Sequence, residues 1–311
     1  MKKHIGIIGG GAAGMMAAVT AARKGTKVTI LERNDRIGKK ILQTGNGKCN
    51  LGNKNLTVEC YHGGDAAWIK QALERFGTED TVCFFQKIGL LIKEKNGYLY
   101  PVSEQAASVL DVLRYELQTL GVEIIYGCKV QKVERTRSGK LVVNDGDREW
   151  QFDAVILTCG GKAAPGTGSD GSGWKIAKKA GHTCIAPVPA LVQLRCLETD
   201  LLKGIAGVRA DSRVRILCDG RETDVERGEL QLTEYGISGI PIFQLSRDVN
   251  YLLRDRKTVM AEIDFLPDMT EESYENMKKT RRMLQEKPDY LFVMIDLDNF
   301  KQVNDSYGHD Q

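Results

Sequence analysis

Three glycines and one acid near the amino terminus have the spacing of a dinucleotide site. Gly9, Gly11 and Gly14 fit the pattern G-x-G-x-x-G, and Glu32 ends the next apolar run. In such a site the first glycine permits a tight turn, the second lets the backbone approach a pyrophosphate, and the third allows close helix packing. Glu32 can accept a hydrogen bond from a ribose hydroxyl and would repel a 2′-phosphate, which favours FAD or NAD over NADP. The adjacent Arg33 weakens that preference.

These residues need a strand–turn–helix–strand unit to position them. The short apolar run 5–8 predicts a buried parallel strand, and residues 27–31 (KVTIL) predict a second one. Between them, residues 12–24 predict a helix that begins with Ala12 and Ala13. The free N–H groups of such a helix start bind phosphate.

A polar, glycine-rich loop follows at residues 36–51 (RIGKKILQTGNGKCNL). Asn46, Gly47 and Asn50 can place amide groups against a flavin ring or a phosphate, and Lys40 adds positive charge. The same composition also suits an ordinary turn-rich loop, so both readings stay open.

A second strand–glycine element lies further along the chain. Residues 152–158 (FDAVILT) predict one buried strand that ends near Gly160 and Gly161. A glycine-rich loop, 166–173, then precedes a short predicted helix. Flavoproteins use such an element to bring backbone near the cofactor, although an ordinary connection has the same composition.

Taken together, these segments resemble the bacterial NAD(P)/FAD-dependent oxidoreductases of the aminoacetone-oxidase-like and bile-acid-reductase-like (BaiN-type) family. The matching pieces include IIGGGAAGMMAA, GKKILQTGNGKCN, VILTCGGKAAPGTGSDGSGWKIAKKAGH and EYGISGIPIFQLSR, and they cover roughly residues 1–275. The resemblance implies FAD as cofactor and NAD(P)H as a possible co-substrate. It implies three groups of site residues: Gly9, Gly11, Ala12, Ala13, Gly14, Glu32 and Arg33 at the ADP half; Lys40, Asn46, Gly47 and Asn50 near the flavin; and Val130, Gly160 and Gly161 at the adenine side and second sheet element.

The implied fold class is α/β, with an FAD-binding Rossmann-type parallel sheet of the two-dinucleotide-fold type, an inserted β-rich domain and a truncated helical segment. We expect an FAD domain at 1–189, a β-rich domain at 190–268, a helical junction at 269–288 and a separate tail at 289–311. Ser103 and Glu104 are expected to begin a helix that runs to Leu120. The family's closing glycine-rich segment has no match in this sequence.

The tail, residues 289–311, resembles the opening of a GGDEF (diguanylate cyclase) domain through the pattern DLDNFKxVNDxYGH. That resemblance implies a strand at 291–295 and a Mg²⁺ ligand at Asp296 if a complete GGDEF domain were present. Two alternatives to a flavin oxidoreductase follow: a diguanylate-cyclase-related signalling protein, or an inactive dinucleotide-binding remnant.

The composition of the chain limits the kinds of binding partner that we expect. The balance of 44 Lys and Arg against 41 Asp and Glu gives a net charge of +3, so nucleic acid is not an expected partner. No apolar stretch approaches the roughly 18 residues of a membrane span. The eight cysteines form no C-x-x-C pair and the four histidines have no metal-ligand spacing. We therefore expect a cytoplasmic protein that acts on a small molecule, with no metal and no membrane partner. The catalytic residues, the substrate and the oligomeric state stay open.

Overall fold

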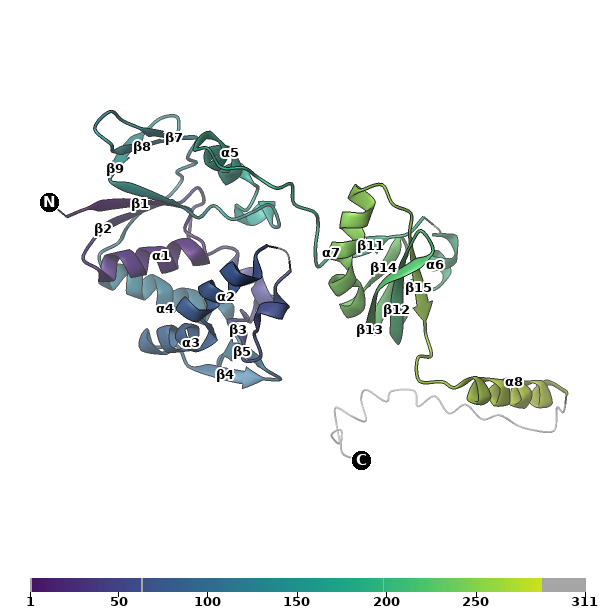
Figure 1. Ribbon diagram of the computed structural model, residues 1–311. Coiled ribbons are helices and arrows are strands. Elements are labelled where there is room, and N and C mark those ends of the chain that lie inside the picture. Colours follow the sequence, from purple (N-terminus) through teal and green to yellow (C-terminus); the bar gives the residue numbers. More distant parts are fainter. Residues whose placement is uncertain (1, 63, 198, 287–311) are drawn as a thin grey trace. The chain divides into compact units, whose positions relative to one another are not determined.

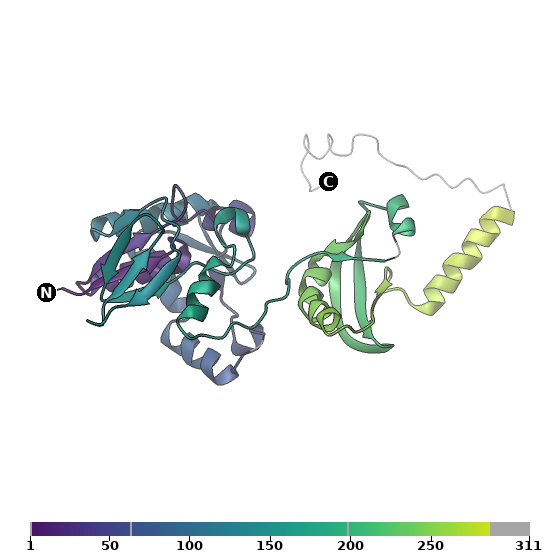
Figure 2. The ribbon, with the colours of Figure 1, turned by 90° about the horizontal axis from the view of Figure 1, so that it is seen from above.

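The computed structural model describes residues 2–62, 64–197 and 199–286. The chain divides into two compact units, Met1–Ala186 and Pro187–Gln311 (Figures 1 and 2). The predicted tail strand at 291–295 and Asp296 lie outside the described residues.

The first unit is built on a parallel sheet whose strand order is β10-β1-β2-β6. These strands are β1 (His4–Ile8), β2 (Lys27–Leu31), β6 (Glu123–Ile125) and β10 (Ala154–Leu157), and helix α1 (Ala12–Arg23) connects β1 to β2. The predicted strand–turn–helix–strand unit is therefore present. Because all four strands run the same way, their carboxyl ends share one edge of the sheet.

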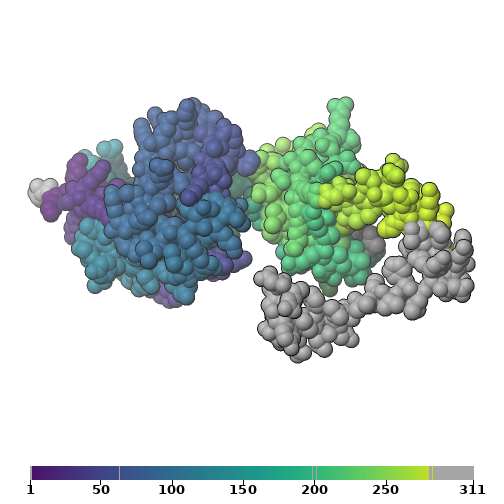
Figure 3. Space-filling view, turned by 90° about the horizontal axis from the view of Figure 1, so that it is seen from below, coloured from purple at the N-terminus to yellow at the C-terminus, as the bar shows by residue number. Residues whose placement is uncertain are grey.

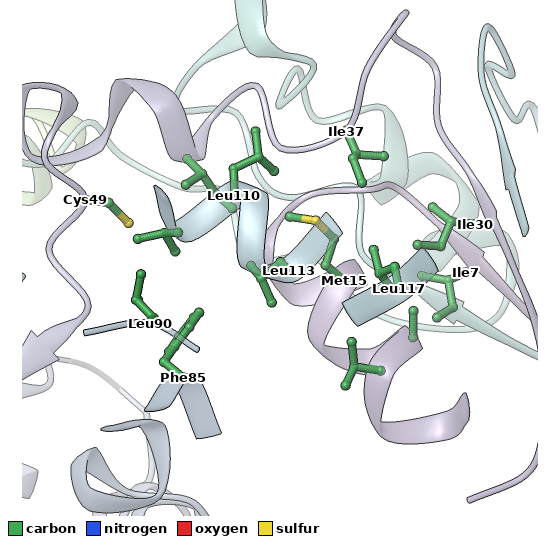
Figure 4. Packing of buried hydrophobic residues seen from close by; sticks show 14 of the residues in the cluster. Ile7, Met15, Ile30, Ile37, Cys49, Phe85, Leu90, Leu110, Leu113 and Leu117 are labelled. Carbon is green, nitrogen blue, oxygen red and sulfur yellow. The ribbon is translucent and has the colours of Figure 1, made fainter. Parts of the chain in front are cut away.

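Helices α1 and α4 (Ala106–Thr119) cover one face of this sheet (Figure 1). Their packing forms the largest apolar core, part of which is drawn in Figure 4. Its most buried side chains, each at most 1% exposed, include Ile7, Met15, Ile30, Leu113 and Leu117. Burying a side chain of this size contributes about 1.5–3 kcal/mol.

The opposite face is covered by an antiparallel meander of β7 (Lys132–Arg135), β8 (Leu141–Asn144) and β9 (Glu149–Phe152). Phe152 packs against Ile8 and Leu31 in a second core. The prediction of one continuous strand over 152–158 is wrong at its start: Phe152 ends β9, and β10 begins at Ala154. The chain changes sheets at Asp153, whose N–H donates to the carbonyl of His4 at 2.8 Å.

A third, small sheet has the order β3-β5-β4 and lies beside two helices. Its strands are Gly52–Asn53 (β3), Ile92–Lys95 (β4) and Tyr98–Pro101 (β5). The helices are α2 (Ala66–Arg75) and α3 (Thr78–Lys87), in the segment coloured blue in Figure 3. Short 3₁₀ turns lie at η1 (Ile41–Gly47), η2 (Val58–Cys60) and η3 (Pro165–Thr167), and α5 (Ser172–Lys179) follows the second glycine loop.

Helix α4 starts later than the sequence predicts. Glu104 has a φ of +52°, a left-handed conformation that cannot continue into a helix, and the Ser103 hydroxyl accepts a hydrogen bond from the N–H of Gln105 at 3.3 Å. The first helical residue is therefore Ala106 and not Ser103. The side chain of Glu104 forms ion pairs with Lys48 and Lys93.

The second unit is an antiparallel sheet of order β11-β14-β13-β12-β15 with α7 (Ile240–Arg254) on one face. Its strands are Leu194–Arg195 (β11), Arg209–Cys218 (β12), Arg221–Thr233 (β13), Gly236–Gly239 (β14) and Val259–Asp264 (β15). Two further helices are α6 (Asp200–Gly204) and α8 (Glu271–Glu286). The unit is thus β-rich, and as a compact unit it spans Pro187–Gln311.

Candidate dinucleotide site

A pocket of about 350 Å³ lies at the carboxyl ends of β1, β2 and β10. Nine of the predicted site residues line it: Gly9, Gly11, Ala12, Ala13, Glu32, Arg33, Lys40, Val130 and Gly160. Gly14, Asn46, Gly47, Asn50 and Gly161 do not line it. Its volume is within the range of ligand pockets, roughly 300–1,000 Å³.

The three glycines of the first motif have three different surroundings. Gly9 has a φ of +106°, and a Cβ there would lie 2.7 Å from the carbonyl oxygen of Thr158. A Cβ on Gly14 would lie 1.9 Å from the carbonyl oxygen of Gly9, so only glycine allows this close packing. A Cβ on Gly11 would meet no protein atom within 4 Å and would enter open space. Gly9 and Gly14 are therefore needed by the fold, whereas Gly11 keeps room for a ligand.

The start of α1 offers unshielded backbone donors to the pocket. No side chain caps this helix, and its first turn contains no acidic residue. An uncapped helix start of this kind binds anions through its N–H groups and its dipole. The donor set here suits a pyrophosphate.

Glu32 is 5% exposed and accepts three hydrogen bonds from the chain itself. Its Oε2 accepts from the N–H of Gly10 at 2.7 Å, and its Oε1 accepts from the backbone and side-chain N–H groups of Asn34 at 2.8 and 2.7 Å. A carboxylate has about four acceptor positions, so capacity is left for a ribose hydroxyl. Glu32 thus fixes the glycine loop in addition to facing the pocket.

Gly10 and Asn34 have roles that the motif did not reveal. A Cβ on Gly10 would lie 2.3 Å from the Cγ2 of Ile37, so this position too requires glycine. The Asn34 side chain joins Glu32 to the second glycine loop, because its Nδ2 also donates to the carbonyl of Thr167 at 3.2 Å. The sequence feature that could have predicted this role is the position of Asn34, a polar residue two positions after Glu32.

Arg33 forms an ion pair with Asp170, another residue that sequence reasoning missed. Its Nη1 lies 2.6 Å from the Asp170 Oδ2. Hydrogen bonds from Arg33 and from Ser172 hold the pKa of Asp170 well below its usual range. Asp170 lies in the glycine-rich loop 166–173, but nothing in that loop's spacing indicated which cation it would meet.

The loop of residues 40–50 contributes Lys40, Ile41 and Thr44 to the pocket wall, and of its predicted site residues only Lys40 lies there. Gly45, Asn46 and Gly47 take three successive positive φ values, +54°, +52° and +83°. The Oδ1 of Asn50 accepts from the N–H of Gly52 at 3.0 Å. The loop is joined to the small sheet through Lys48 and Glu104, whose side chains approach to 2.6 Å.

The residues after β10 contribute the Thr158 hydroxyl and the Cys159 thiol to the pocket wall, and Cys128, which follows β6, contributes a second thiol. The Thr158 hydroxyl donates to the carbonyl of Gly9 at 2.8 Å, which ties β10 to the first glycine loop. Burial raises the pKa of the Cys159 thiol to about 11 and that of Cys128 to about 12. Both thiols are therefore neutral near pH 7 and are poor nucleophiles.

Gly160 and Gly161 continue this turn toward the second glycine loop. Gly160 has a φ of +72°, and a Cβ there would lie 2.8 Å from the Ser169 hydroxyl oxygen. The carbonyl of Gly161 accepts from the N–H of Gly171 at 2.9 Å.

Over the residues that the structure describes, no three metal-ligating side chains gather at one place. In that same part of the chain no helix has the length and apolar character needed to cross a bilayer.

A protein-family model described as the HI0933-like protein Rossmann domain matches residues 3–248. The chain belongs to the HI0933-like family. This HI0933-like chain is 46% identical over 268 residues to the 3-dehydro-bile acid delta(4,6)-reductase of Clostridium scindens. The aligned region covers 86% of the chain and 65% of that protein. It is 32% identical over 278 residues to a ribosomal RNA dihydrouridine synthase of Haemophilus influenzae, covering 88% of the chain and 67% of that protein. The chain thus spans about two thirds of the length of these curated relatives.

These findings confirm the family predicted from the motifs, and the parallel sheet with α1 confirms the Rossmann-type fold. A second family model, the diguanylate cyclase GGDEF domain, matches residues 266–311. The predicted likeness of the tail is confirmed by that match. The match begins at residue 266, ahead of the expected residue 289, and so includes α8.

Proposed function

We propose that this HI0933-like chain is an FAD-dependent oxidoreductase. The observation that carries the proposal is the pocket at the ends of β1 and β2, where an uncapped helix start, an open position at Gly11 and the buried Glu32 occur together. These residues fit a dinucleotide. Bound FAD supplies the capacity to take up and release a hydride, and the protein supplies binding and orientation.

Each predicted residue has a proposed part in binding. The N–H groups of Gly11, Ala12 and Ala13 take the pyrophosphate, and Glu32 accepts from a ribose hydroxyl. Val130 faces the adenine, and Gly160 and Gly161 bring backbone near the cofactor from β10. Lys40, Asn46, Gly47 and Asn50 lie toward the flavin. Gly9 and Gly14 shape the turn, and Arg33 lies beside Glu32 in the pocket wall. No general acid or base is assigned.

The reaction class we propose is the reduction of a carbon–carbon double bond with NAD(P)H as the hydride donor. The names of both curated relatives describe such a reduction, in a bile acid and in a uridine of ribosomal RNA. We propose a small-molecule substrate and no nucleic acid, because the higher identity is to the bile acid reductase and the net charge is only +3. A cytoplasmic location agrees with such a donor.

A cyclase-related role is the second candidate, and the match of residues 266–311 favours it. Phosphoryl transfer needs metal ions and phosphate-positioning groups together. Deleting residues 289–311 separates the candidates: flavin content and reductase activity are expected to persist without the tail. A large drop in bound flavin after the deletion would contradict the first proposal's assignment of the site to the first unit.

The test of the first proposal is the visible absorption spectrum of the purified chain, with the released cofactor identified by mass spectrometry. We expect a flavin spectrum and FAD. Oxidation of NADH or NADPH is then followed with a 3-oxo-Δ4 steroid acid, and with a uridine-containing RNA as comparison. A chain that stays colourless after incubation with FAD would favour an inactive dinucleotide-binding remnant. Turnover of the RNA alone would overturn the proposed substrate class.

A further inference from the structure

The end of β2 carries two side chains with opposite preferences for a dinucleotide. Glu32 suits a free ribose hydroxyl, whereas an arginine near the same position accommodates a 2′-phosphate. Arg33 is that arginine here, and it lines the pocket beside Glu32. The sequence alone therefore leaves open whether the pocket accepts a 2′-phosphorylated adenosine.

Residues of the second glycine loop, 166–173, hold the side chain of Arg33. Its Nη1 lies 2.6 Å from the Asp170 Oδ2, and the two side chains are 31% and 30% exposed. The same Nη1 lies 3.5 Å from the carbonyl oxygen of Gly168. The other oxygen of Asp170 accepts from the N–H of Ser172 at 3.0 Å. Asp170 is therefore fixed by the backbone on one side while it neutralises Arg33 on the other.

We propose that Asp170 is a specificity-determining residue that excludes a 2′-phosphorylated adenosine from the dinucleotide pocket. A 2′-phosphate would have to displace Asp170 from Arg33 to gain that cation, and the carboxylate of Glu32 lies beside Arg33 in the same pocket wall. While Asp170 occupies Arg33, the negative charge of Glu32 opposes a phosphate that has no free cation at this position. The inference rests on the proposed function, because it concerns the pocket assigned to FAD.

Two lysines could attract the same phosphate and must be separated from Arg33. Lys129 and Lys175 line an adjoining cavity of about 460 Å³ together with Asp170, and Lys129 also lines the dinucleotide pocket. Both are exposed, and neither has an ion-pair partner among the described residues. The test therefore needs a background that lacks Arg33.

The variant that tests the proposal is Asp170→Asn in the full chain. Asparagine keeps the shape and an oxygen that can accept from the N–H of Ser172, but it removes the negative charge. Asp170→Ser is a second variant with a short polar side chain that can also accept this bond. The dissociation constants of 5′-ADP and 2′,5′-ADP are measured by calorimetry on the flavin-free chain, with circular dichroism to check folding.

We expect the ratio of the two constants to shift about tenfold in favour of 2′,5′-ADP in Asp170→Asn, with 5′-ADP changed less than about twofold. In an Arg33→Ala background the same substitution is expected to give no shift, since the interaction it releases is absent. An unchanged ratio in both folded Asp170 variants would overturn the proposal. So would a shift that persists without Arg33, because the lysines would then be responsible.

The same titrations distinguish this inference from the proposed function. If FAD does not bind the wild-type chain but the two nucleotides do, the proposed function fails and the ratio still decides the role of Asp170. If neither nucleotide binds, the pocket is not an adenosine site and the inference is overturned as well.

Discussion

The sheet of the first unit is packed on both faces, whereas the sheet of the second unit is packed against α7 on one face and carries charges on the other. Ile7 and Ile8 point to different cores across β1. Along β12, buried Val214 and Ile216 alternate with Arg213 and Arg215. In a sheet packed on both faces, substitutions of buried residues disturb a core, and the pocket lies at the ends of the strands, where this packing stops. The following changes test that contrast.

The largest effect is expected from Gly14→Val in the first unit. The new Cβ would lie 1.9 Å from the carbonyl oxygen of Gly9, so α1 must move away from β1. We expect a loss of stability of about 3 kcal/mol or more, together with loss of flavin. Gly11→Ala is the matched control, because its Cβ meets open space. It should lose flavin affinity at least about tenfold with a stability change within about 1 kcal/mol. Urea unfolding measures the stability of each variant, and flavin titration measures its affinity. Full flavin content in folded Gly11→Ala would show that Gly11 does not contact the cofactor.

An intermediate effect is expected from Glu32→Gln. The amide nitrogen that replaces one carboxylate oxygen cannot accept from Gly10 or Asn34, which leaves a buried N–H group without its partner. The expected cost is about 1–3 kcal/mol in the free energy of unfolding. The comparison is Glu74→Gln at an exposed position on α2, where the change should be within about 0.5 kcal/mol. Equal unfolding curves for the two variants would show that Glu32 does not hold the glycine loop.

The lowered pKa of Glu104 predicts a pH dependence of stability at the loop of residues 40–50. Hydrogen bonds from Lys48 and then Lys93 lower the pKa of Glu104 from 4.5 to about 2. Because the folded-state pKa is the lower one, this stabilisation is present above about pH 4.5 and is lost as the pH falls toward 2. The wild-type melting temperature should therefore fall more steeply over that range than that of Glu104→Gln. Glu74→Gln is the reference variant. If the melting temperatures of wild type and Glu104→Gln fell in parallel with pH, the stabilising role of the Glu104 carboxylate would be contradicted.

The smallest effect is expected on the charged face of the second unit. Arg227 lies 2.7 Å from Asp211 and 2.5 Å from Asp268, but all three side chains are exposed and screened by water. Arg227→Met should change the melting temperature by no more than about 2–4 °C and leave flavin binding unchanged. A loss of flavin in this variant would show that the two units are coupled and that the contrast between them is incomplete.

Local sequence determined the part of the site that one continuous segment builds. The apolar runs, the glycine spacing and the acid after β2 predicted β1, α1 and β2, because strand burial, turn geometry and helix start depend on neighbours within a few residues. The same reasoning failed at Ser103 and Phe152. There, the left-handed backbone of Glu104 and the packing of Phe152 in the second core accompany boundaries that the local pattern did not predict.

Only the tertiary structure decided how the second glycine loop meets the end of β2. Arg33 and Asp170 are separated by 137 positions in the chain, and Asn34 and Thr167 by 133. Parallel strands bring these segments to one edge of the sheet, but no local pattern states which side chains pair there. The sequence by itself therefore established a dinucleotide fold and its glycine loop. The charge state of the pocket wall depended on an ion pair that forms only once β10 lies beside β1.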